Sequence, residues 1–287
     1  MKNISLIFFL IIIALAGAIP ASAQNAGDFD AVRIEDDFNL AYPLGKTEEV
    51  VSYLRARYIE DQTFVQSLGP NFTSSFGDED FIDTYFDTQN FDLYQRKIGL
   101  RHRIRIDRLD PASQKNGREL IQLKLSGDDK LSDIQSTTSR NELKYDVVRP
   151  TAVVSADDRH PVLGLVAENL RPEFKSRRGE LGINPDDLRA ILTIAQRRQR
   201  VYLNRDGATF VSFSMDDASS HVWWAKGEFS QMEVELNELV YTDADMQTRE
   251  QLQAIRTDLI SDLRARFDYL EDDTTIKYTK MFDLLEN

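Results

Sequence analysis

The sequence predicts an α+β fold made mainly of β-strands, in which eight antiparallel strands close into a barrel with a charged lumen and helices packed outside. The first observation behind this prediction is that segments such as residues 100–106 alternate charged and apolar side chains with the two-residue period of a strand. The second is that such segments recur along the chain with polar connections between them. A closed barrel would pair both edges of every strand, and external helices would cover its apolar faces.

A third observation is the local sign of the charge. Residues 96–124 contain nine Lys and Arg residues and three acidic ones, in a chain whose net charge is -13. A basic segment in an acidic protein favours the binding of a dense anion, with protection of a sheet edge by solvated charges as the alternative. An acidic pI near 4.8 argues against general nucleic-acid binding, so a phosphate site should be enclosed.

The first residues have the pattern of a secretory signal peptide. A basic start at Lys2 precedes an apolar run over residues 4–19 and an Ala-Ser-Ala end, which predicts cleavage after Ala23. We therefore expect residues 24–287 to form a single exported domain, periplasmic or secreted, without a membrane span after cleavage. The chain has no cysteine, which excludes disulfides and thiolate chemistry.

The first half of the chain is expected to consist mostly of strands. Residues 32–40 have a strand pattern, and residues 46–58 have helical spacing, with Val50 and Leu54 on one stripe. Further strands are expected, between connections rich in Gly, Asp and Ser, at residues 83–87, 100–107, 119–126 and 138–148.

The second half is expected to mix helices and strands. Asn184 followed by Pro185 and two acidic residues predicts the start of a helix. Residues 243–269 predict a long charged helix, because Leu252, Leu259 and other apolar residues recur at three- and four-residue spacing. The remaining segments are strands through residues 198–202, 209–216 and 229–236, and a tail over residues 274–285.

Eight short motifs stand in a consistent order along these strands. They are Asp83-Thr84-Tyr85-Phe86-Asp87-Thr88 with Leu93-Tyr94, Leu100-Arg101-His102-Arg103, Gln122-Leu123-Lys124, Arg140-Asn141-Glu142, Arg198-Gln199-Arg200, Ser214-Met215-Asp216, Glu233-Val234-Glu235-Leu236 and the lysine-bearing tail. In these residues the sequence resembles the CYTH, or triphosphate tunnel metalloenzyme, superfamily. The tail, with Lys277 and Lys280, is similar to that of the vacuolar transporter chaperone (VTC) branch, the polyphosphate polymerases.

The resemblance implies a tunnel that binds triphosphate or longer polyphosphate with Mg²⁺ or Mn²⁺. Guanidinium and ammonium groups are natural partners of phosphate oxygens, and carboxylates suit a hard cation. By motif match, the residues assigned to phosphate are Arg101, Arg103, Lys124, Arg140, Arg198, Arg200, Lys277 and Lys280. The residues assigned to metal are Glu35, Glu142, Glu233 and Glu235, and those assigned to catalysis are Glu35 and Asp216. The implied reaction is in-line attack on a phosphoryl group.

The first motif departs from the family pattern. The family has Glu-x-Glu-x-Lys before a Phe, whereas this chain keeps only Glu35 and has Arg33 and Asp37 at the other two positions. This removes one implied metal ligand and one implied cation. Three functions are therefore kept open: an exported metal-dependent phosphohydrolase acting on triphosphate, polyphosphate or a nucleoside triphosphate; a non-catalytic polyphosphate or polyanion binder; and a polyphosphate polymerase.

Overall fold

The computed structural model describes residues 33–69, 71–113, 116–125, 137–149, 153, 155–180, 182–223, 225–237 and 245–286. The predicted signal peptide, residues 1–23, lies outside this part of the chain. The described residues are mostly antiparallel sheet with helices, so the predicted α+β class is confirmed. Among the helices of the described part, none is both long enough and apolar enough to cross a membrane.

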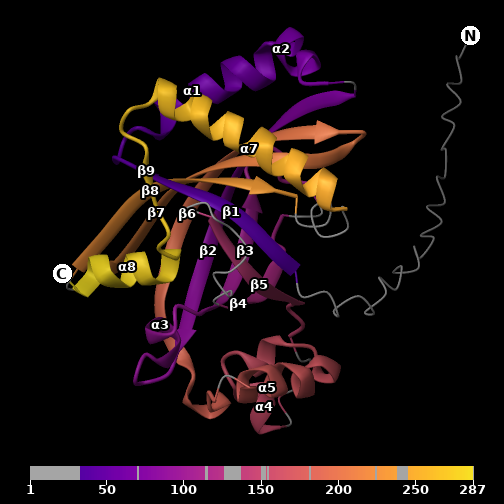
Figure 1. The fold of residues 1–287 in the computed structure, drawn as a ribbon. Coiled ribbons are helices and arrows are strands. Elements are labelled where there is room, and N and C mark those ends of the chain that lie inside the picture. Colours follow the sequence, from indigo (N-terminus) through magenta and orange to yellow (C-terminus); the bar gives the residue numbers. More distant parts are fainter. Residues whose placement is uncertain are drawn as a thin grey trace, which may run out of the picture. The chain divides into compact units, whose positions relative to one another are not determined.

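One antiparallel sheet of nine strands organises the chain (Figure 1). Its order is β5-β4-β3-β2-β6-β7-β8-β1-β9. The strands are β1 (Arg33–Tyr42), β2 (Phe72–Asp87), β3 (Gly99–Asp107), β4 (Glu119–Lys124), β5 (Thr137–Asp146), β6 (Arg189–Arg205), β7 (Ala208–Val222), β8 (Ala225–Leu236) and β9 (Glu271–Asp272). Eight of these strands, β1 to β8, match segments predicted from the sequence, but β2 begins well before residue 83 and β6 before residue 198.

Strand β1 makes a third pairing, which the linear strand order does not show. Besides β8 and β9, it pairs antiparallel with β5, with Arg33 opposite Glu142 and Phe38 opposite Thr137. The coarse expectation of a mainly antiparallel sheet with helices holds, whereas closure into a barrel remains a prediction.

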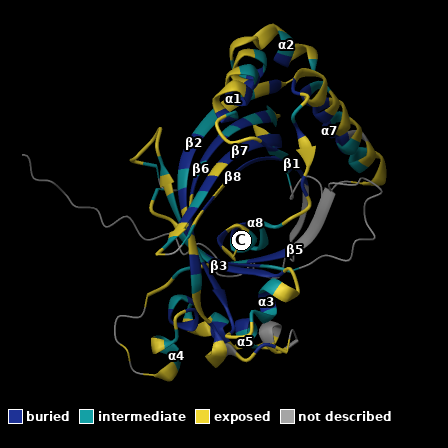
Figure 2. Cartoon of the chain, turned by 90° about the vertical axis from the view of Figure 1, so that its left-hand side faces the viewer, coloured by how far each residue is buried: buried dark blue, intermediate teal, exposed yellow. Residues whose placement is uncertain are grey.

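Helices α1 (Thr47–Arg55), α2 (Gln62–Ser67) and α7 (Met246–Arg266) cover one face of the sheet (Figure 2). A π-helical turn, Ala56–Glu60, connects the first two. Their apolar side chains share a core with β1, β6, β7 and β8 that includes Leu54, Val201 and Leu263. The predicted helix over residues 243–269 is thus confirmed as α7, and its apolar stripe is what attaches it to the sheet.

A second core lies against β3, β4 and β5. Helix α5 (Arg171–Glu180) contributes Phe174, whose ring meets that of Tyr145 in β5 edge to face at 5.2 Å. The preceding α4 (Ala156–Arg159) begins with a capping box at Ser155. The sequence patterns above did not predict these helices, because both are short and highly charged and carry little apolar periodicity.

The helix predicted from Asn184 is wrong. Residues Pro185–Asp187 form a single 3₁₀ turn, and β6 begins at Arg189. β6 pairs with β2 from its first residue, Arg189, onward. The residues from Arg189 on, which the N-cap signal assigned to a helix, are therefore part of the sheet.

Helix α8 (Lys277–Glu286) packs on the opposite face of the sheet from α1 and α7, inside its curve (Figure 2). Its Met281 and Leu285 join Leu192 and Phe229 in a third core. Gly227 of β8 makes this approach possible, because a Cβ at that position would lie 2.6 Å from the Met281 sulfur.

Between these cores the face that carries α8 is lined with charges, and we call it the charged face. Strand alternation places the following side chains on it: Asp83 and Tyr85 (β2), Arg101 and Arg103 (β3), Gln122 and Lys124 (β4), Glu142 and Lys144 (β5), Gln196, Arg198 and Arg200 (β6), Ser212, Ser214 and Asp216 (β7), and Gln231, Glu233 and Glu235 (β8).

Candidate functional site

Asp83 organises the arginines of β3. Its two carboxylate oxygens accept hydrogen bonds from Arg103 Nε at 2.7 Å and Nη2 at 2.6 Å, and Arg101 Nη1 donates to it at 3.2 Å. Arg101 also donates to the Tyr85 hydroxyl at 3.2 Å and to Gln122 at 2.8 Å. Burial alone would raise the pKa of Asp83, but the two guanidinium groups lower it to about 2. One carboxylate therefore serves two cations.

Glu142 has the same relation to two lysines. The Lys144 ammonium lies 2.5 Å and the Lys124 ammonium 3.9 Å from its carboxylate, which is 1% exposed. Gln122 donates to the same carboxylate at 3.3 Å and so connects this group with Arg101. Strands β3 to β5 thus present four cations around two carboxylates.

A four-residue ion cluster joins β6, β7, β8 and α8. Arg198 binds Asp216 through Nε and Nη2, both at 2.6 Å, and its Nη2 also lies 2.6 Å from Glu233. Lys277, the first residue of α8, lies 2.6 Å from Asp216 and 2.8 Å from Glu233. Two cations and two carboxylates therefore form a closed ring of contacts, and we call it the ion square.

The ion square is buried, and its two carboxylates also accept hydrogen bonds from glutamine side chains. Gln196 donates to Asp216 at 3.0 Å and Gln231 to Glu233 at 3.3 Å. Burial would raise the pKa of Glu233, yet Lys277 and Arg198 hold it well below its ordinary value. For Lys277, burial together with Arg198 lowers the pKa, against the attraction of the two carboxylates.

Three other predicted residues lie outside these groups. Arg200 donates to two hydroxyls, those of Ser214 at 2.8 Å and Tyr202 at 3.0 Å. Glu235 accepts from Ser212 at 3.2 Å. Lys280 pairs with Asp273 and lies over the ring of Phe229, so the structure does not bring it to the ion square.

Two predicted residues can be placed only by strand register. Glu35 lies opposite Arg140 where β1 pairs with β5, and Asp37 lies opposite Glu235 where β1 pairs with β8. The side chains of Glu35 and Arg140 lie outside the described residues.

The carboxylates of the charged face do not fit a divalent cation at Glu233. Both oxygens of Glu233 and both of Asp216 already accept hydrogen bonds from the cations of the chain. Glu142 is likewise held by two lysines. Across the residues that the structure describes, no three acidic, histidine or cysteine side chains are grouped so as to hold a metal ion.

Several side chains that contact the assigned residues of the charged face were not assigned a role from the sequence, among them Asp83, Lys144, Gln196 and Gln231. Lys144, Gln196 and Gln231 each share the alternation phase of an assigned residue on the same strand, so phase was the available signal for these three. Strand β2 carries no assigned residue, so Asp83 had no such signal. What alternation cannot show is that Asp83 is the shared acceptor of Arg101 and Arg103, because that pairing depends on the register of β2 with β3.

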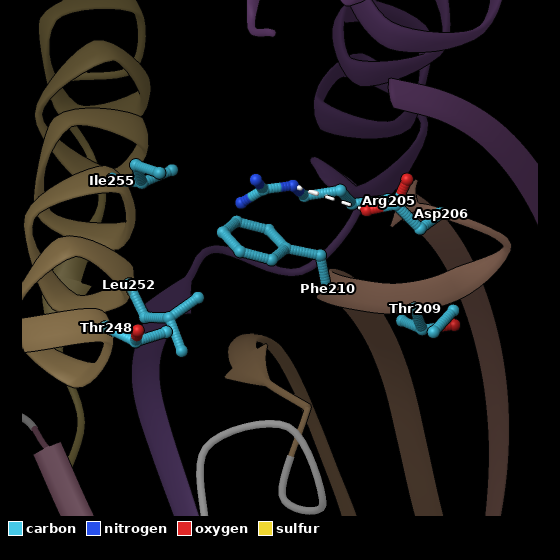
Figure 3. A pocket seen from close by; sticks show the side chains of 8 residues that line it. Arg205, Asp206, Thr209, Phe210, Thr248, Leu252 and Ile255 are labelled. Atoms are coloured by element: carbon cyan, nitrogen blue, oxygen red, sulfur yellow. Dashed lines mark ion pairs between the residues drawn. The ribbon is translucent and has the colours of Figure 1, made fainter. Parts of the chain in front are cut away.

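A separate cavity of about 240 Å³ lies between α7 and the β6–β7 hairpin (Figure 3). Its lining is mostly apolar, from Phe210, Leu252 and Ile255, and the ion pair of Arg205 with Asp206 at 3.7 Å borders it. None of the residues that line it belongs to the charged face.

Comparison with known proteins places this fold in a family. The family model for the CYTH domain matches residues 53–259, more than two thirds of the chain. A search of curated protein sequences finds none that matches.

Similar solved structures include HpAC1 from Hippeastrum, described as having a dominant triphosphatase activity (14% identity, TM-score 0.48, covering 87% of this chain and 95% of that one). Another is bh2851 of Bacillus halodurans, described as a candidate adenylate cyclase (14% identity, TM-score 0.46, covering 87% of this chain and 98% of that one). A third is the Pct1 RNA triphosphatase of S. pombe (9% identity, TM-score 0.42, covering 82% of this chain and 85% of that one). On the strength of the family model, this chain belongs to the CYTH domain family.

Proposed function

We propose that this chain binds a triphosphate or a longer phosphate chain on the charged face and hydrolyses one of its phosphoanhydride bonds. Membership of the CYTH family and the placement of the basic side chains support this proposal. In the proposed reaction the arginines and lysines hold and orient the phosphate oxygens so that water can attack in line with the leaving phosphate.

The observation that carries the proposal is the grouping of four cations on β3 to β5. Arg101 and Arg103 share one carboxylate, and Lys124 and Lys144 share another. These four cations lie close together in a protein of net charge -13. An anion with several oxygens can accept charge-assisted hydrogen bonds from such a group of cations, and the planar guanidinium groups suit phosphate geometry.

The closed tunnel belongs to the same proposal. The pairing of β1 with β5 supports it, since these strands would join the two ends of an eight-strand order. Closure would place β1, with Glu35 and Asp37, beside the phosphate-binding strands.

A second function, binding without turnover, is favoured by the first motif. Arg33 and Asp37 stand where the family has a glutamate and a lysine. A carboxylate at position 37 repels a polyanionic substrate and supplies no cation to stabilise the transition state.

The decisive experiment measures binding and turnover together. Phosphate release from tripolyphosphate, ATP and polyphosphate is assayed with Mg²⁺, with Mn²⁺ and with EDTA, because CYTH triphosphatases generally depend on a divalent metal. Tripolyphosphate affinity is measured by calorimetry. Binding with turnover supports the hydrolase, binding alone supports the binder, and growth of polyphosphate from ATP would identify a VTC-like polymerase. Absence of binding in all conditions contradicts the proposal.

We also propose that the chain is exported. The residue pattern before Gln24 supports this. Expression of the full chain followed by mass spectrometry of the processed protein should find a mature N-terminus at Gln24, and recovery of unprocessed protein alone would contradict export.

A further inference from the structure

The ammonium of Lys277 lies where a bridging cation would lie. It is 2.6 Å from an oxygen of Asp216 and 2.8 Å from an oxygen of Glu233, so one positive group is shared by two carboxylates from different strands. A divalent cation that used Glu233 would need these same oxygens. The side chain and a metal ion therefore compete for one position.

Charge balance favours the lysine. Arg198 and Lys277 neutralise the two carboxylates of the ion square, and all four side chains are buried. A divalent cation added to this neutral group would leave two uncompensated charges in a buried environment, which is strongly unfavourable.

The packing of α8 holds Lys277 in position. The next residue, Tyr278, stacks on Tyr85 and donates a hydrogen bond to Asp87 at 2.8 Å. Met281 of the following turn is fully buried against Gly227. The ammonium of Lys277 could therefore leave the ion square only if its side chain changed conformation or if α8 moved.

We propose that Lys277 takes the place of a divalent cation at Glu233, so that this chain binds a phosphate chain without metal. The inference rests on the proposed binding of phosphate chains and deepens it. Neutralisation of the bound phosphates then falls to the grouped cations of β3 to β5 and to Arg200, whose described side-chain partners are the hydroxyls of Ser214 and Tyr202.

Calorimetry on the wild-type chain gives the first test. Tripolyphosphate should bind in EDTA with an affinity within about threefold of that measured with Mg²⁺, a difference below ~1 kcal/mol. Binding that requires Mg²⁺ would overturn the inference and leave the proposed function standing. Absence of binding in both conditions would overturn both.

A second test uses Mn²⁺ alone, without phosphate, and reads its binding by electron paramagnetic resonance. Wild-type protein should show no Mn²⁺ site that depends on Glu233, whereas Lys277→Met should acquire one, since loss of the ammonium leaves the two carboxylates with Arg198 as their one cation in the ion square. Lys226→Met, a change at an exposed lysine of β8, is the matched control and should behave as wild type. A wild-type Mn²⁺ site that disappears in Glu233→Gln would refute the inference, even if Lys277→Met failed to fold.

Discussion

The ring of Tyr278 stacks on that of Tyr85 with centroids 5.1 Å apart and planes 7° from parallel. Tyr85 belongs to β2 on the charged face, and its hydroxyl accepts a hydrogen bond from Arg101. Tyr278 follows Lys277 in α8. The stack therefore connects the arginine pair of β3 with the ion square.

Removal of the Tyr278 hydroxyl tests how firmly its hydrogen bond to Asp87 anchors this residue. Tyr278→Phe should lower the free energy of unfolding by about 1–3 kcal/mol, because Asp87 loses a buried hydrogen bond. Urea titration measures the change. Tyr269→Phe is the control, since that hydroxyl has no hydrogen-bond partner among the described residues and its loss should be nearly neutral. Equal effects of the two changes would contradict the role given to Tyr278.

Asp83 should make the protein sensitive to acid. Its pKa of about 2 in the folded chain lies below the ordinary 3.8, so its stabilising effect is present above about pH 4 and is lost as the pH falls toward 2. The loss should be about 2 kcal/mol. Urea titrations across this range should show a flatter pH dependence for Asp83→Asn. Asp80→Asn, at a more exposed carboxylate of the same strand, should keep the wild-type slope.

Arg103 should contribute directly to phosphate binding. Arg103→Ala is expected to weaken tripolyphosphate binding about ten- to a hundredfold, since a charge-assisted hydrogen bond contributes about 1.5–3 kcal/mol. Calorimetry gives the affinity, and circular dichroism checks the fold. Arg103→Lys, which keeps the charge near Asp83, covers the case in which the alanine variant unfolds. Arg108→Ala, at an exposed arginine paired with Asp80, should bind as wild type, and an unaffected Arg103→Ala would contradict the assignment.

Asp37 should limit binding. Asp37→Lys is expected to tighten tripolyphosphate binding, because it replaces a carboxylate opposite Glu235 with the ammonium that the family pattern has there. Asp36→Lys makes the same charge change at the alternate position of the strand and serves as the control. If wild-type turnover lies in the common range of roughly 1–1000 per second, Asp37 does not impair catalysis.

Strand alternation predicted much of the charged face. Arg101, Arg103, Lys124 and Glu233 are all on it because a two-residue period fixes the face of each side chain. Alternation does not give pairing, so the sequence could not show that Glu233 is saturated by Arg198 and Lys277. That arrangement depends on where α8 docks.

The helical predictions depended on apolar periodicity. Periodicity identified α7, whose Leu252 and Leu259 are buried, but it could not identify α5, which is highly charged. The capping signal at Asn184 failed because a local preference of this size is overridden by pairing of β6 with β2. Lys280 shows the same limit: a lysine three residues from Lys277 reaches Asp273 instead of the ion square.

The placement of β1 has a consequence for how the chain folds. Phe38 pairs with Val234, so β1 can join β8 only after a loop of about 200 residues has closed, and loop closure precedes any gain from the contacts it permits. We expect β1 to dock late and refolding to be slow. Until it docks, β8 presents an unpaired edge that another unfolded molecule can occupy, so recovery from denaturant should fall as protein concentration rises.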